Sequence, residues 1–261
     1  MNLIIMSKDR ACQLELLLKS MNKFFKNLNN YKINILYTYS NEEFKKGYTI
    51  LSENYKNVNF VLEKDFKKDM ISLVNPMNEY TMFLMDDIVF KEDFSMDDYE
   101  VKLFKANKNI MSLSLRLHPN LTYCYAARIQ MKKPTLLFEK NIINWRQETG
   151  DYGYPMSLDG NLWRTNQILN YINNFNYNNP NSLESAMAIR PLDIPFLLFY
   201  EKSKIINLPI NKVQTFNNNF HGNISAEYLN KEFLNNKRIV MENIEHIENT
   251  AFHQEINIIM K

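Results

Sequence analysis

The first 115 residues alternate between short apolar runs and amphipathic stretches, and this alternation limits the folds that the chain can adopt. Apolar residues recur every three or four positions after residue 10, over 41–55 and over 65–74, which predicts helices there. The apolar runs between these stretches have the length of strands. They occupy residues 2–6, 33–39, 58–63, 80–85 and 109–117. This order favours a doubly wound, mainly parallel sheet, whose ligand crevice lies at the carboxyl ends of the strands.

The pattern loosens after residue 116, where aromatic and polar segments replace the regular alternation. Segment 143–165 holds three of the five glycines and both tryptophans, which predicts a shaped loop leading into a helix from about Asn161. A further helix is predicted over 182–189. We find no internal repeat or linker, so we expect one domain over 1–261, with parts of about 1–115 and 116–261.

Composition excludes several classes of protein. A chain of 261 residues with 45% hydrophobic content can bury a large core. The net charge is +2 without a long basic block, so nucleic acid is not an expected partner. Two cysteines without metal-ligand spacing fit a reducing compartment. The apolar start is too short for a signal peptide, and residues 194–200 fall far short of the ~20 residues of a membrane-spanning helix. We therefore expect a cytoplasmic protein, either free or peripheral to the inner face of the membrane.

The segment YTMFLMDDIVF, residues 80–90, places Asp86 and Asp87 at the end of an expected core strand. Burying an unpaired carboxylate is costly, so the doublet needs water, a cation or a metal beside it. Carboxylates suit Mg²⁺ or Mn²⁺, which often recruit phosphate oxygens to complete their coordination. An ordinary polar turn is the alternative interpretation.

Three motifs in order, SKDRACQLELLLKSM, FLMDDIVF and MSLDGNLWR, resemble the nucleotide-sugar-dependent glycosyltransferases of the GT-A fold. The resemblance implies a GT-A-like, Rossmann-like α/β fold in which about 1–115 binds the nucleotide-sugar donor and about 116–261 binds the acceptor. It also implies that a variant of the Asp-x-Asp motif holds Mn²⁺ or Mg²⁺ against the donor diphosphate. On this basis Asp87 is assigned to the metal and Asp86 to the ribose or the surroundings of the metal.

The resemblance implies an inverting transfer of a sugar to a glycan or another surface component. Charge builds on the departing phosphate, which a bound cation stabilises, and the acceptor hydroxyl needs a base. Asp159 is the predicted base, with Asp151 as its competitor and as a candidate ligand of acceptor or sugar. The structural alternative for Asp159 is a helix cap.

Further candidates follow the first and fifth strands. Asp9 and Arg10 are expected to contact the nucleobase and the diphosphate, with Gln13 one helical turn further on. Their alternative is a solvated loop at a helix N-terminus, where the helix dipole favours an acid. Arg116 faces either phosphate or acceptor, or forms a salt bridge to the doublet.

Aromatic residues and a late histidine complete the predicted site. The aromatic candidates are Trp145, Tyr152, Tyr154 and Trp163. Their rings either form a wall on which a sugar stacks or pack in the core. In many GT-A enzymes a late histidine closes over the donor as a metal ligand, and His221 beside Gly222 is the candidate here. An exposed loop histidine is the alternative.

Three other classes of protein share part of this sequence pattern. A sugar-phosphate nucleotidyltransferase is expected to carry a glycine-rich loop after the first strand, and SKDRACQ contains no glycine. A metal-dependent hydrolase is expected to carry a cluster of His and Asp residues, and this sequence shows no such cluster. A non-catalytic carbohydrate-binding protein that keeps the sheet is the remaining alternative.

Overall fold

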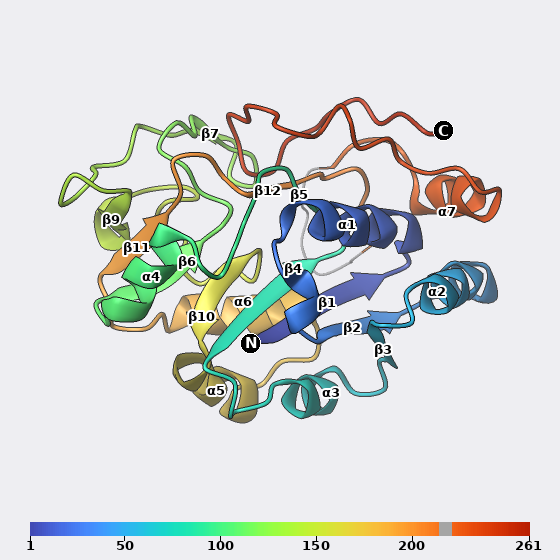
Figure 1. The fold of residues 1–261 in the computed structure, drawn as a ribbon, viewed down its shortest axis with the longest axis horizontal. Helices are drawn as coiled ribbons and strands as arrows, with labels where there is room; N and C mark the ends of the chain where they lie inside the picture. The colour runs from blue at the N-terminus through green and yellow to red at the C-terminus, as the bar shows by residue number, and fades with distance from the viewer. Residues whose placement is uncertain (214–220) are drawn as a thin grey trace.

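The computed structural model describes residues 1–213 and 221–261. The chain forms one eight-stranded sheet with helices on both faces (Figure 1). In spatial order the strands are β3 (Asn59–Leu62), β2 (Ile33–Thr38), β1 (Asn2–Lys8), β4 (Tyr80–Met85), β10 (Asn161–Arg164), β6 (Ile110–Ser114), β11 (Phe196–Phe199) and β9 (Ile142–Asn144). The predicted α/β fold, a mainly parallel sheet flanked by helices, is confirmed.

Strands β3, β2, β1 and β4 are parallel, and their carboxyl ends therefore meet at one edge of the sheet. Alternate residues of β1 face opposite sides: Leu3 and Ile5 join one hydrophobic core, while Ile4 and Met6 join the other. Both faces are buried, so these strands read as continuous apolar runs. The strand predictions at 2–6, 33–39, 58–63, 80–85 and 109–117 are confirmed, with small differences at their ends.

Each core is covered by its own set of helices. The helices α1 (Ala11–Phe24), α2 (Glu42–Asn54), α4 (Tyr99–Ala106) and α7 (Ala226–Leu234) contribute to the core that contains Leu3. The helices α3 (Phe66–Leu73), α5 (Thr165–Asn174) and α6 (Pro180–Ile189) contribute to the core that contains Ile4. Figure 1 shows α1 and α7 on one side of the sheet and α3 and α5 on the other.

Shorter elements complete the fold. They are η1 (Leu28–Asn30), η2 (Trp145–Gln147), the antiparallel pair β5 (Ile88–Phe90) and β12 (Ile205–Asn207), and the pair β7 (Tyr123–Cys124) and β8 (Ile129–Gln130). The apolar run that resumes after the doublet is thus a second buried strand, β5, in a separate small sheet. No helix within 1–213 or 221–261 has the length and apolar character needed to cross a membrane.

The helix predicted from about Asn161 is wrong at its start. Residues Asn161–Arg164 form β10, which pairs antiparallel with β4 and with β6, and α5 begins only at Thr165. Leu162 and Trp163 pack into opposite cores. Pairing with β4 on one side and β6 on the other stabilises a strand at these residues. The predicted helix over 182–189 is confirmed as part of α6.

Candidate active site

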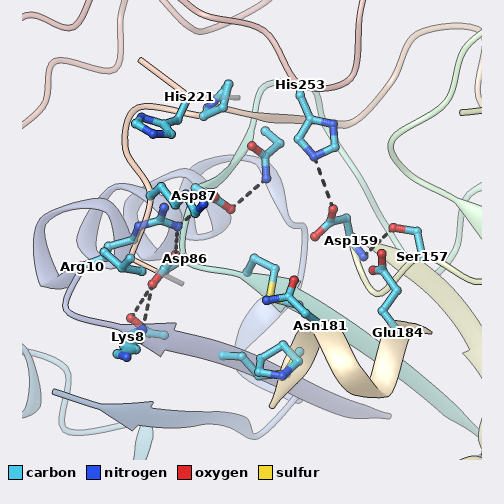
Figure 2. A pocket seen from close by; sticks show the side chains of 18 of the residues that line it. Lys8, Arg10, Asp86, Asp87, Ser157, Asp159, Asn181, Glu184, His221 and His253 are labelled. Carbon is cyan, nitrogen blue, oxygen red and sulfur yellow. Dashed lines mark hydrogen bonds and ion pairs between the residues drawn. The ribbon is translucent and has the colours of Figure 1, made fainter. Parts of the chain in front are cut away.

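A cavity of about 1070 Å³ opens at the carboxyl ends of β1, β2 and β4, where the sequence predicts the ligand crevice. Ser7, Lys8 and Thr38 line it from the strand ends, and Asp86 and Asp87 line it from the turn after β4. The opposite wall contains Asp159, together with Glu184 of α6 and His253 (Figure 2). Residues from both halves of the chain therefore meet in one cavity.

The doublet is held by protein donors. The Asp86 carboxylate accepts hydrogen bonds from Ser7 Oγ at 2.8 Å and from the Lys8 backbone N–H at 3.1 Å. Burial raises the pKa of the Asp86 carboxyl to about 6, and Arg10 opposes this rise. The Asp87 carboxylate accepts a bond from Asn207 Nδ2 at 2.8 Å, which ties the turn to β12.

Arg10 bridges the two aspartates. Its Nη1 lies 3.1 Å from Asp86 Oδ1 and 2.9 Å from Asp87 Oδ2. Its Nε donates to Asn211 Oδ1 at 2.8 Å, and its Nη2 donates to the Asn211 carbonyl. The sequence predicts Arg10 at a diphosphate. In the structure it lines the cavity, and its side chain is 11% exposed.

Asp159 is held in the opposite wall by the turn that leads into β10. Gly160 has a φ of +65° and donates its N–H to the Phe83 carbonyl, which fixes this turn against the end of β4. Asp159 N donates to Ser157 Oγ at 3.2 Å. The Asp159 carboxylate accepts no hydrogen bond from the described residues, and His253 Nε2 lies 3.7 Å from its Oδ2. The side chain is therefore partly open to the cavity, at 14% exposure.

The electrostatic surroundings of Asp159 raise the affinity of its carboxylate for a proton. Burial raises the pKa of the Asp159 carboxyl well above its usual range, and the negative charges of Glu184 and Asp87 raise it further. Burial lowers the pKa of His253, which favours a neutral imidazole beside this acid. A carboxyl group with a raised pKa near a cavity is suited to proton transfer. The alternative of a helix cap is wrong, because Asp159 precedes a strand and Arg164 is the N-cap residue of α5.

Glu184 links α6 to the loop that carries Asp159. Its Oε2 accepts from the Leu158 backbone N–H at 2.8 Å, and its Oε1 accepts from the Tyr154 hydroxyl at 2.9 Å. Burial raises the pKa of Glu184. Sequence reasoning missed Glu184 and His253, because their partners are distant in sequence and neither residue belongs to a motif.

Arg116 pairs with Asp151 instead of the doublet. Its Nη1 lies 2.8 Å from Asp151 Oδ1, and its Nη2 donates to the carbonyl oxygens of Asp151 and Tyr154. The predicted salt bridge to the doublet is therefore wrong, since Arg10 takes that place. Arg116 and Asp151 both line the cavity, so their predicted contact with the acceptor or donor stays a prediction.

Two predicted nucleotide contacts have protein partners. Asp9, with a φ of +56°, accepts hydrogen bonds from the backbone N–H and the hydroxyl of Ser40, which joins the ends of β1 and β2. Gln13 is buried and its Nε2 donates to Asn211 Oδ1 at 3.2 Å. Neither residue is among the described residues that line the cavity. The structure therefore does not place Asp9 or Gln13 at the cavity wall, and their contact with a nucleotide stays a prediction.

The predicted aromatic wall is not assembled. Trp163 is 0% exposed within the core, and Tyr152 is buried with its hydroxyl on the His118 carbonyl. Trp145 donates its indole N–H to the Ile194 carbonyl and is not among the described lining residues. Tyr154 alone of the four lines the cavity. For Trp163 and Tyr152 the alternative of core packing is correct, because apolar neighbours enclose both rings.

The carboxylates of the predicted Mn²⁺ or Mg²⁺ site already have protein partners, and the metal itself stays a prediction. Within 1–213 and 221–261, no group of three or more His, Cys, Asp or Glu side chains is arranged to hold a metal ion. All four carboxylate oxygens of the doublet already accept bonds from protein donors. His221 lines the cavity, but it is exposed, and its Nδ1 contacts the Gly222 carbonyl.

Comparison with known proteins supplies an independent line of evidence. No family model matches the chain. In an alignment of 190 positions that covers 66% of this chain, the chain is 32% identical to the bifunctional glycosyltransferase pgtA of Dictyostelium discoideum. The match covers 25% of that protein, so this chain spans about a quarter of its relative.

Similar solved structures belong to two classes of enzyme. The S. aureus TarS 1-349 structure in complex with UDP-GlcNAc is 10% identical, with a TM-score of 0.41 over 77% of this chain and 59% of that chain. A cytidylyltransferase of Leptospira borgpetersenii is 14% identical, with a TM-score of 0.41 over 78% of this chain and 76% of that chain. With TM-scores below 0.5, neither likeness assigns a function. The sequence similarity to pgtA confirms the predicted resemblance of this chain to glycosyltransferases.

Proposed function

We propose that the chain is a glycosyltransferase that moves a sugar from a nucleoside-diphosphate sugar to a hydroxyl group of a glycan or another surface component. The observation that carries the proposal is the partly open carboxylate of Asp159 in the large cavity of a chain similar in sequence to a glycosyltransferase. The cavity is large enough for a donor and part of an acceptor.

The proposed reaction is a single displacement with inversion at the anomeric carbon. The acceptor oxygen attacks this carbon as the bond from the carbon to the phosphate oxygen breaks. The nucleoside diphosphate leaves with the bonding electrons, and the acceptor hydroxyl gives its proton to Asp159 Oδ. A carboxyl group whose pKa is raised by burial holds this proton more readily than an exposed one.

The two walls of the cavity suit the two halves of this reaction. Lys8 and Arg10 stand at the strand ends, where a diphosphate finds positive charge and N–H donors (Figure 2). Asp159 stands across from them, beside Tyr154 and Glu184, which offer hydroxyl and carboxylate groups to a sugar. The dependence on Mn²⁺ or Mg²⁺ stays a prediction from the sequence, and no step of the proposed reaction uses a metal.

The test is a screen of nucleoside-diphosphate sugars for release of the nucleoside diphosphate, with EDTA and with Mn²⁺. One donor should be turned over by the parent protein, and Asp159→Asn should abolish turnover while keeping donor affinity. Asp193→Asn is a matched control, because the Asp193 side chain is 99% exposed and not among the described lining residues. Glycan binding without turnover of any donor would instead identify a non-catalytic carbohydrate-binding protein.

A further inference from the structure

The acidic doublet has no carboxylate oxygen without a protein donor. Asp86 Oδ2 accepts from Ser7 Oγ and the Lys8 N–H, and Asp86 Oδ1 accepts from Arg10 Nη1. Asp87 Oδ2 accepts from the same Nη1, and Asp87 Oδ1 accepts from Asn207. A divalent cation at the doublet would have to share these oxygens with the protein donors and lie beside the positive charge of Arg10.

Both the backbone and the guanidinium of Arg10 are held by hydrogen bonds. Its backbone N–H donates to the Tyr48 hydroxyl at 3.2 Å at the start of α1, and Asn211 binds its Nε and Nη2. Removing this guanidinium from the doublet would leave a largely buried cation without its carboxylate partners, which is strongly unfavourable. The planar fork of an arginine makes this arrangement possible, and a lysine would not reproduce it.

The donor set around the doublet is also poor for a metal. Mg²⁺ and related ions need about six oxygen ligands, supplied by carboxylates, water and phosphate. The described part of the chain offers no cluster of three His, Cys, Asp or Glu side chains for such an ion. The guanidinium of Arg10 already stands between the two carboxylates, where it neutralises one of their charges.

We infer that Arg10 is the resident cation of the acidic doublet and that this site holds a nucleoside diphosphate without a divalent metal. Guanidinium N–H groups form charge-assisted hydrogen bonds to phosphate oxygens. Lys8 and Lys212 also line the cavity and add positive charge for a diphosphate. The inferred exclusion of a metal rests on the contacts of Arg10 and of the doublet, whereas the diphosphate ligand rests on the proposed function.

The first experiment measures Mn²⁺ binding to the metal-free protein by titration calorimetry. We expect no binding of Mn²⁺ to the parent protein at 1 mM Mn²⁺. Arg10→Ala, in which the doublet is exposed, should bind Mn²⁺ at least tenfold more tightly than the parent. Asp87→Asn in the Arg10→Ala background should remove the gain. Arg146→Ala is a matched control, because it removes an arginine paired with an aspartate outside the cavity lining. If Arg10→Ala does not fold, Arg10→Gln replaces it, since a neutral amide also lowers the positive charge.

The second experiment measures the affinity for UDP, GDP and CDP in EDTA and in Mn²⁺. The parent should bind one of them with less than a twofold difference between the two conditions, and Arg10→Gln should lose at least tenfold in EDTA. Tight Mn²⁺ binding to the parent, or a tenfold gain in nucleotide affinity with Mn²⁺, would overturn the inference. Failure to bind any nucleotide in either condition would instead refute the proposed function, while the first experiment still decides whether Arg10 excludes the metal.

Discussion

Replacing Asp159 by asparagine should remove the base of the proposed reaction while sparing or improving the stability of the fold. The substitution keeps the shape of the side chain and removes its charge. In the parent protein, burial and the charges of Glu184 and Asp87 raise the pKa of this carboxyl, so its ionised form costs the folded state free energy. The asparagine carries no such cost.

The magnitudes follow from the contacts of the residue. Loss of a general base should slow transfer by roughly 10²–10⁴-fold, which corresponds to about 3–5 kcal/mol of transition-state free energy. The Asp159 carboxylate accepts no hydrogen bond from the described residues, so the typical ~1 kcal/mol loss of a helix cap does not apply.

The pH dependence has a definite sign. The raised pKa of Asp159 contributes stability below its unfolded pKa, and this contribution is lost as the pH rises through its folded pKa. The melting temperature of Asp159→Asn relative to the parent should therefore increase from pH 5 to pH 8. The assays are thermal melting at both pH values and the transfer rate with the donor found by screening.

A genuine aspartate cap supplies the control. Asp65 caps α3 by accepting a hydrogen bond from the Lys68 N–H at 3.1 Å. Asp65→Ala should lose about 1 kcal/mol of stability, or roughly 2–4 °C in melting temperature, with full transfer. If Asp159→Asn behaves like this control, with a lower melting temperature and full transfer, the assignment of the base is refuted.

Three further predictions concern the frame of the cavity. Gly160→Ala should destabilise the protein by about 1–3 kcal/mol in urea denaturation, because φ is +65° and the new Cβ would lie 2.1 Å from Ile205 Cδ1; unchanged stability would contradict this turn geometry. Trp163→Ala should cost about 3–5 kcal/mol and leave the nucleotide affinity of the folded protein unchanged; lost affinity at unchanged stability would restore its stacking role. Burial raises the pKa of Asp86 to about 6, so the stability that this carboxyl contributes below its unfolded pKa should be lost as the pH rises through about 6. Asp86→Asn should lack that part of the pH dependence, and identical pH profiles of variant and parent would refute the raised pKa.

The parallel half of the sheet and the edge at which the cavity opens can both be predicted from the sequence. Runs such as 2–6 and 80–85 carry their strand signal locally, because strands buried on both faces are continuously apolar. Since parallel strands end at one edge, the sequence also placed Arg10 and the doublet together. Asp159 is predicted at the cavity only through the resemblance to glycosyltransferases, and the helix expected after it is the strand β10.

The rest of the site depends on contacts between residues that are distant in sequence. Periodicity reports the neighbours of a residue along the chain, whereas the insertion of β10 between β4 and β6 depends on strands far apart in sequence. Arg10 meets Asn211 across 201 positions, and Glu184 and His253 join Asp159 through loops that carry no periodic signal. The partner of each buried charge is set by three-dimensional proximity. For that reason the sequence alone does not show that Arg10 contacts both carboxylates of the doublet, at the place where a metal is predicted.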